Sequence, residues 1–311
     1  MFHVEHRRMD YHLHTNHSMD GRQTMPELCE TMLARGVQEI ALTEHIEPGH
    51  PEEEMDVPPV WADWFAEIAR CRAAYPALII RSGIEIGDNP LCRAETKALL
   101  DTLPQYHRKS CAMDALAQGI ESWWAKKATP GSRIHAERAI RGVLDNLTAY
   151  MQGDRKAQDE MLHAAYESGV AILTTRTTAA HAMSYQITKK LGAAHGHACM
   201  LTLPHLWAHL AAQAEYQPML MELAHILGGE KPMDGAVLLK GLLAVLELDK
   251  IPMPDDATLD MLAASVNPER LGNHPEALTT AQLRAIYVQA FTPMTDTERA
   301  EAIAAWEQYG K

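Results

Sequence analysis

The apolar residues of this 311-residue chain follow one pattern up to about residue 90 and another after about residue 95. In the first part, short apolar segments alternate with helical patterns. We predict strands at 9–14, 39–43 and 77–84, and helices at 26–35 and 61–75. Strand–helix–strand units at this spacing favour right-handed crossovers and therefore a parallel sheet.

After about residue 95 the strand signal stops. Segments rich in Ala, Leu, Met, Glu and Gln have apolar residues three and four positions apart, and they fall at 109–126, 132–152, 157–175 and 178–191. This pattern predicts an all-α helical bundle of about seven to nine helices. We therefore expect an α/β N-terminal part with about three parallel strands at residues 1–98, followed by an all-α bundle at residues 99–311.

Composition excludes several classes of protein. The formal charge of −13 argues against a nucleic-acid partner, which needs a basic face. No apolar run approaches the roughly 18 residues of a membrane span, and the first ten residues do not resemble a signal peptide. The five cysteines are an odd number and include no C-x-x-C pair, so a reduced, cytoplasmic protein is expected. An unpaired edge on the strand at 77–84 predicts self-association.

Histidines and carboxylates gather at the predicted strand ends. Asp10, His12 and His14 alternate and would share one face of the first strand. The second strand leads to His45 and the third to Glu85. Parallel strands carry such side chains to one edge of the sheet, where α/β barrels build their sites. The pattern indicates a metal site, with a solvent-exposed polar rim as the alternative.

The segments DYHLHTNHSMD, ALTEH and RSGIEIG, within residues 8–100, resemble the first half of a PHP (polymerase and histidinol phosphatase) domain of the histidinol-phosphatase type. The resemblance implies a partial βα barrel whose metal ions activate water against a phosphoester substrate. It also implies five metal ligands, namely His12, His14, Asp20, His45 and Glu85. The family's second-half ligands have no counterpart here, because Asp10-Tyr11-His12 is the only D-x-H segment. We therefore expect one ion at this end rather than two or three.

A second group of polar residues lies in the helical part. Asp114 and Gln118 are four positions apart and so share a helix face, while His181 and His195 belong to other predicted helical segments. Together they could converge on one divalent ion inside a bundle. The alternatives are a carboxylate in a first helical turn, a surface amide and a core histidine.

Residues 99–311 resemble the helical C-terminal domain of iron-containing (group III) alcohol dehydrogenases. The matching stretches are LPQYHRKSCAMDALAQGIESWW, TTAAHAMSYQITKKLGAAHGHACMLTLPHLW and SVNPERLGNHPEALTTAQLRAIY. The resemblance implies a metal held by Asp114, His181, His195 and the residue at 118. Gln118 replaces a family histidine, and Tyr185 replaces another that is usually found nearby. A glutamine carbonyl binds softer metals less strongly than imidazole. The expected ion is Fe²⁺, Zn²⁺ or Mn²⁺, and the glutamine weakens the expectation of Fe²⁺.

The same resemblance implies NAD(P) as cofactor and a small alcohol or aldehyde as substrate. The family's glycine-rich nucleotide turn does not occur in this sequence, so weak NAD(P) binding is expected. The chain is thus interpreted as a metal-binding, oxidoreductase-like protein, inactive because the nucleotide-binding domain is missing. One alternative is a phosphoester hydrolase with an incomplete site. Another is a non-functional hybrid reading frame joined near residues 88–105.

Overall fold

The computed structural model describes residues 9–18, 21–46, 61–86 and 103–309. The chain divides into two compact units, Met1–Thr102 and Leu103–Lys311.

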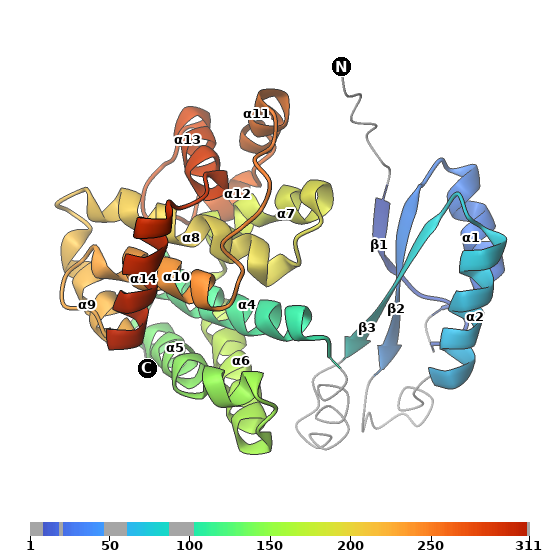
Figure 1. The fold of residues 1–311 in the computed structure, drawn as a ribbon, viewed down its shortest axis with the longest axis horizontal. Helices are drawn as coiled ribbons and strands as arrows, with labels where there is room; N and C mark the ends of the chain where they lie inside the picture. Colours follow the sequence, from blue (N-terminus) through green and yellow to red (C-terminus); the bar gives the residue numbers. More distant parts are fainter. Residues whose placement is uncertain (1–8, 19–20, 47–60, 87–102, 310–311) are drawn as a thin grey trace. The chain divides into compact units, whose positions relative to one another are not determined.

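The first unit is a small α/β layer. Three parallel strands lie in the order β1 (Met9–Leu13), β2 (Glu39–Ile46) and β3 (Ile79–Ile86). Helices α1 (Met25–Ala34) and α2 (Trp61–Ala74) connect them and lie on the same side of the sheet (Figure 1). The prediction of a small parallel sheet is confirmed, whereas its interpretation as part of a barrel stays a prediction.

Local sequence signals explain the bounds of α1. Thr24 and Glu27 form a capping box, in which each side chain accepts a hydrogen bond from the other residue's backbone N–H. Pro26 suits the first turn of a helix, where a backbone donor has no intrahelical partner. The buried side chains of α1, α2 and the strands form one core cluster, whose members are Met25, Leu28, Cys29, Met32, Ile40, Leu42, Trp64, Ile68, Cys71, Leu78 and Ile80.

The second unit is entirely helical over its described residues, as predicted. Its helices are α4 (Gln105–Trp124), α5 (Pro130–Met151), α6 (Arg155–Thr175), α7 (Ala179–Leu191), α8 (His195–Ala211), α9 (Gln217–Leu227), α10 (Asp234–Val245), α11 (Asp256–Ala264), α12 (Pro268–Leu271), α13 (Thr280–Phe291) and α14 (Asp296–Tyr309). The described residues thus hold eleven helices rather than seven to nine, because the region after residue 250 breaks into short ones. None of the described helices is long and apolar enough to cross a membrane.

Helix α4 organises this unit. It packs against α5, α6 and α8, while α7 packs against α8 (Figure 1). At the start of α8, Gly196 lies so close to α4 that a Cβ atom there would sit 2.0 Å from the Ser110 carbonyl oxygen and 2.7 Å from the Asp114 nitrogen. Glycine therefore allows the first turn of α8 to contact the middle of α4. This contact places the neighbouring residue, His195, beside Asp114.

A candidate metal centre

Four potential metal donors converge where α4, α7 and α8 meet. Asp114 comes from α4, His181 from α7, and His195 and Cys199 from α8. One donor atom from each residue lies within 4.8 Å of all the others. His195 and Cys199 are four positions apart on α8, so they share one helix face.

The spacing of the donor atoms suits a tetrahedral ion. His181 Nε2 lies 3.4 Å from Asp114 Oδ1, and His195 Nε2 lies 3.6 Å from the same oxygen. Cys199 Sγ is 3.8 Å from His195 Nε2. Zinc–ligand bonds of about 2.0–2.3 Å in a tetrahedron put neighbouring donor atoms roughly 3.3–3.7 Å apart. These three separations are close to that range, and the other donor pairs lie within 4.8 Å.

Two buried atoms at this centre have no hydrogen-bond partner among the described residues. They are Asp114 Oδ1 and His181 Nε2, which face each other without hydrogen-bond geometry. A buried polar atom left unpaired is costly, and buried carboxylates and imidazoles normally find a partner or a metal. These two atoms without hydrogen bonds, and the nitrogen, oxygen and sulfur donors around them, fit a divalent cation.

Glu121 fixes the orientation of His181. This fully buried carboxylate on α4 contacts His181 Nδ1 through Oε2. Its Oε1 accepts hydrogen bonds from Thr178 and from the Ala180 N–H, the latter at 2.8 Å. A carboxylate bound at Nδ1 keeps the proton on that nitrogen and leaves the Nε2 lone pair free. In its neutral form, His181 therefore presents an acceptor atom to the centre.

Gln118 supports Asp114. Its amide nitrogen donates to Asp114 Oδ2 at 2.9 Å, and its amide oxygen accepts from the Ser168 hydroxyl at 2.8 Å. Both polar atoms of the amide are thus engaged by protein groups. This arrangement leaves Asp114 Oδ1 directed at the two histidines.

The electrostatics of the centre are dominated by negative charge. Burial disfavours the charged imidazole of His181, but the nearby Cys199 thiolate and the Glu121 carboxylate outweigh burial and raise its pKa well above the usual value. Burial likewise opposes the raised pKa of His195, and Cys199 and Asp114 again outweigh it. Burial alone would raise the pKa of the Cys199 thiol, yet the two histidines lower it. The donors therefore favour positive charge at their centre.

One side of the centre is more open than the other. The His195 side chain is 41% exposed, whereas that of His181 is 3% exposed. The Tyr185 ring stacks on His195 with centroids 5.9 Å apart, and the Arg270 guanidinium lies 5.5 Å from the Tyr185 centroid. The more exposed side of the centre is therefore the one that carries His195, Tyr185 and Arg270.

Sequence reasoning missed two residues of this site. Cys199 follows His195 by four positions, and Glu121 follows Asp114 by seven, so helical spacing alone puts each on the relevant face. The neighbouring His197 is engaged elsewhere, since its ring contacts the Leu248 carbonyl at 2.8 Å and the Tyr106 hydroxyl at 3.0 Å.

The other predicted site lies mostly outside the described residues. Asp20, and the side chains of His12, His45 and Glu85, lie outside what the structure describes. The backbone of β2 and β3 nevertheless pairs His45 with Glu85 in register, and His14 lies just after β1. Glu44, the residue before His45, is fully buried. Its carboxylate accepts hydrogen bonds from Thr15, Ser18 and Trp64, so its role is structural.

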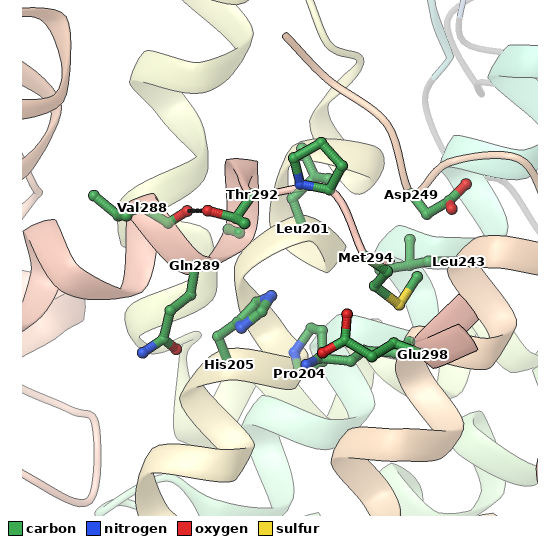
Figure 2. Close-up of a pocket in the computed structure, with 13 residues that line it drawn as sticks. Leu201, Pro204, His205, Leu243, Asp249, Val288, Gln289, Thr292, Met294 and Glu298 are labelled. Carbon is green, nitrogen blue, oxygen red and sulfur yellow. Dashed lines mark hydrogen bonds between the residues drawn. The ribbon is translucent and has the colours of Figure 1, made fainter. Parts of the chain in front are cut away.

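A pocket of 270 Å³ lies elsewhere in the helical unit (Figure 2). It is lined by mixed apolar and polar side chains from α8, α10, α13 and α14, including His205, Gln289 and Glu298. None of the four converging donors lines it, so it is separate from the candidate metal centre.

Comparison with known proteins identifies the helical part. Residues 109–291, more than half of the chain, match the model of the Fe-containing alcohol dehydrogenase family, C-terminal. A phosphonoacetaldehyde reductase from Streptomyces viridochromogenes is 38% identical over 96 residues, which is 30% of this chain and 24% of that protein. The iron-containing alcohol dehydrogenase structure from Thermococcus thioreducens matches with a TM-score of 0.60 and 17% identity, covering 92% of this chain and 93% of that one.

One further curated relative is a protein of a different kind. A histidinol-phosphatase from Lactococcus lactis is 29% identical over 99 residues, which is 32% of this chain and 36% of that protein. The chain spans about half or less of the length of the curated relatives it matches.

Proposed function

The chain belongs to the Fe-containing alcohol dehydrogenase family through its C-terminal domain, and we propose that this domain binds one divalent metal ion between Asp114, His181 and His195. The observation that carries the proposal is the convergence of the donor atoms, two of which, Asp114 Oδ1 and His181 Nε2, are buried and have no hydrogen-bond partner among the described residues. A cation placed between them would compensate both at once.

When bound, the ion supplies Lewis acidity toward an alcohol or aldehyde oxygen. The chain's own residues hold the donors in place. Glu121 keeps the His181 ring oriented and Gln118 holds the Asp114 carboxylate. Tyr185 stacks on His195 and borders the exposed side of the centre, where a substrate would lie.

Metal binding is tested by elemental analysis of the full chain after dialysis against Fe²⁺, Zn²⁺ or Mn²⁺, one metal at a time. We expect the Asp114→Asn variant to retain one ion fewer than the unchanged chain. Asp145→Asn, at an exposed position of α5, is the matched control and should retain the full number. Equal metal content in all three proteins would refute the site.

For the substrate class we propose a small aldehyde or alcohol, with preference for one that carries an anionic group. Arg270 is half-buried over Tyr185, and its positive charge would favour such a group beside His195. The phosphonoacetaldehyde reductase is named for a substrate of this kind. Binding of a phosphonate-bearing aldehyde and of a neutral one can be compared by calorimetry, and Arg270→Gln should weaken only the former.

Redox turnover by this chain is proposed to be absent. The sequence contains no G-x-G-x-x-G motif to hold a pyrophosphate, and orientation of the reactants supplies on the order of 7–11 kcal/mol in well-ordered sites. We expect no saturable NAD(P)H binding by fluorescence and no aldehyde reduction with added metal. Turnover that disappears in His195→Ala, and survives in the exposed-site control His225→Ala, would contradict this proposal.

A phosphoester hydrolase is the second candidate, supported by the β2–β3 register that pairs His45 with Glu85 and by the similarity to a histidinol-phosphatase. Its test is Mn²⁺-stimulated release of phosphate from histidinol phosphate or p-nitrophenyl phosphate. We expect one ion and no release, because the second-half ligands are missing. Release that is lost in His14→Ala would instead establish the hydrolase.

A non-functional hybrid reading frame is the remaining possibility for a chain with these two resemblances. The source locus, sequenced across codons 88–105, tests it directly. A frame that is continuous in several independent isolates would exclude a hybrid that arose by assembly error.

A further inference from the structure

We propose that the Cys199 thiolate is a fourth ligand of the ion, and that it makes the site selective for Zn²⁺ over Fe²⁺. The inference rests on the proposed metal-binding function of the same site. It adds a soft donor to the two imidazoles and the carboxylate, and it gives Gln118 the role of a positioning residue.

The position of Cys199 supports ligation. Its sulfur is completely buried, lies one helical turn after His195, and is within 4.8 Å of the other three donor atoms. A buried cysteine with a purely structural role packs against apolar groups. Cys199 instead faces the rings of His181 and His195 and the Asp114 carboxylate.

Charge balance supports the same assignment. A divalent cation and its four ligands, namely the Asp114 carboxylate, one thiolate and two neutral imidazoles, have no net charge. The Glu121 carboxylate is not a ligand, and its charge is offset by the hydrogen bonds that it accepts. A neutral cluster is the arrangement that a site with fully enclosed members such as His181 and Cys199 accommodates at the lowest desolvation cost.

Donor chemistry then selects the metal. Both polar atoms of the Gln118 amide are hydrogen-bonded, to Asp114 and Ser168, so Gln118 is not a ligand in this arrangement. Cys199 is then the fourth donor. Thiolates prefer Zn²⁺ among the divalent ions considered, and the general order of affinity also places Zn²⁺ above Fe²⁺ and Mn²⁺. Four protein donors form a closed tetrahedron, as in structural zinc sites, whereas catalytic zinc keeps a position for water or substrate. Thiolate ligation thus gives an additional reason to expect no turnover.

Cobalt substitution tests the ligand directly. The full chain is freed of metal and titrated with Co²⁺, whose absorption reports its donors without any activity assay. We expect visible bands of a tetrahedral ion together with a near-ultraviolet sulfur-to-cobalt charge-transfer band. Cys199→Ser should lose the near-ultraviolet band, while Cys111→Ser, which alters the exposed cysteine of α4, should keep it.

The outcomes separate this inference from the proposed function. Visible Co²⁺ bands without a charge-transfer band, or a band that persists in Cys199→Ser, would overturn thiolate ligation and leave the metal site intact. No Co²⁺ binding by a folded wild-type chain would overturn the metal site and this inference with it.

Competition between metals tests selectivity. Loss of an outer-shell partner typically weakens metal binding 10–100-fold, and loss of a direct ligand should weaken it at least as much. We therefore expect Cys199→Ser to reduce Zn²⁺ affinity about 100-fold or more and Fe²⁺ affinity less. Circular dichroism confirms that the variant is folded, and Cys199→Ala provides a second variant. An unchanged Zn²⁺/Fe²⁺ affinity ratio would contradict the assignment.

Discussion

His181 Nε2 faces Asp114 Oδ1 at 3.4 Å across the junction of α7 and α4, and neither atom has a hydrogen-bond partner among the described residues. The two residues are 67 positions apart in the sequence. Two further residues hold them in place: Glu121 contacts the Nδ1 atom of His181, and the Gln118 amide donates to Oδ2 of Asp114.

Gln118 and Ser168 predict a graded effect on metal binding. Gln118→Ala removes the hydrogen bond that holds Asp114, so we expect Zn²⁺ affinity to fall about 10-fold or more. Ser168→Ala removes only the hydroxyl behind Gln118, and a smaller loss is expected. Isothermal titration calorimetry of both variants measures the difference. An effect of Ser168→Ala that equals or exceeds that of Gln118→Ala would contradict the proposed chain of support.

Glu121→Gln should destabilise the fold as well as the site. The amide has one oxygen where the carboxylate has two, so its NH2 group faces either Thr178 and Ala180 or His181 Nδ1, and the negative charge beside His181 is lost in both cases. Removing one member of a buried pair costs about 3–5 kcal/mol. Urea denaturation at neutral pH measures the loss. The control, Glu222→Gln, alters an exposed carboxylate 3.9 Å from Arg133 and should change stability by less than about 1 kcal/mol.

His274 predicts a dependence of stability on pH. Its ring is fully buried, packs edge-on against Trp124, and has no hydrogen-bond partner among the described residues. Burial lowers the pKa of His274 to about 4, from an ordinary value of 6.5. Between these values the unfolded chain binds a proton that the folded chain excludes, so the stabilising contribution is complete above pH 6.5 and is lost as the pH falls toward 4.

The loss attributable to His274 is about 3 kcal/mol over that interval. Urea denaturation of His274→Leu at several pH values should show a correspondingly flatter dependence. The exposed His225→Leu should leave the dependence unchanged. Equal pH dependence of stability in His274→Leu and the wild type would show that folding does not lower the pKa of His274.

Two glycines predict opposite effects of the same substitution. Gly196→Ala would force α8 away from α4, because the new Cβ would lie 2.0 Å from the Ser110 carbonyl oxygen. We expect a loss of about 1–3 kcal/mol in stability, together with weaker metal binding. Gly169→Ala, in the middle of α6, meets no atom within 4 Å and should stabilise the protein by up to about 1 kcal/mol. Thermal unfolding of both variants measures the contrast.

Periodicity predicts most of the helices and the three strands, because those patterns depend on neighbours in the sequence. Strand ends are less well predicted: β2 extends to Ile46 and β3 begins at Ile79, positions that depend on pairing between the strands. The assembly of the candidate metal centre was harder to foresee. Cys199 has the pattern of an ordinary core residue, and nothing in the local sequence tells whether the Gln118 amide faces an ion or a neighbouring carboxylate. Contacts between α4, α6, α7 and α8 decide both.

The convergence of donors from α4, α7 and α8 would turn a bound ion into a cross-link. An ion held by Asp114, His181 and His195 would close loops of the chain that the unfolded state leaves open, and its binding free energy would add to that of folding. The melting temperature would then rise with the free metal concentration and fall with a chelator. The melting temperature of the purified chain would therefore depend on how much metal the producing cells supplied.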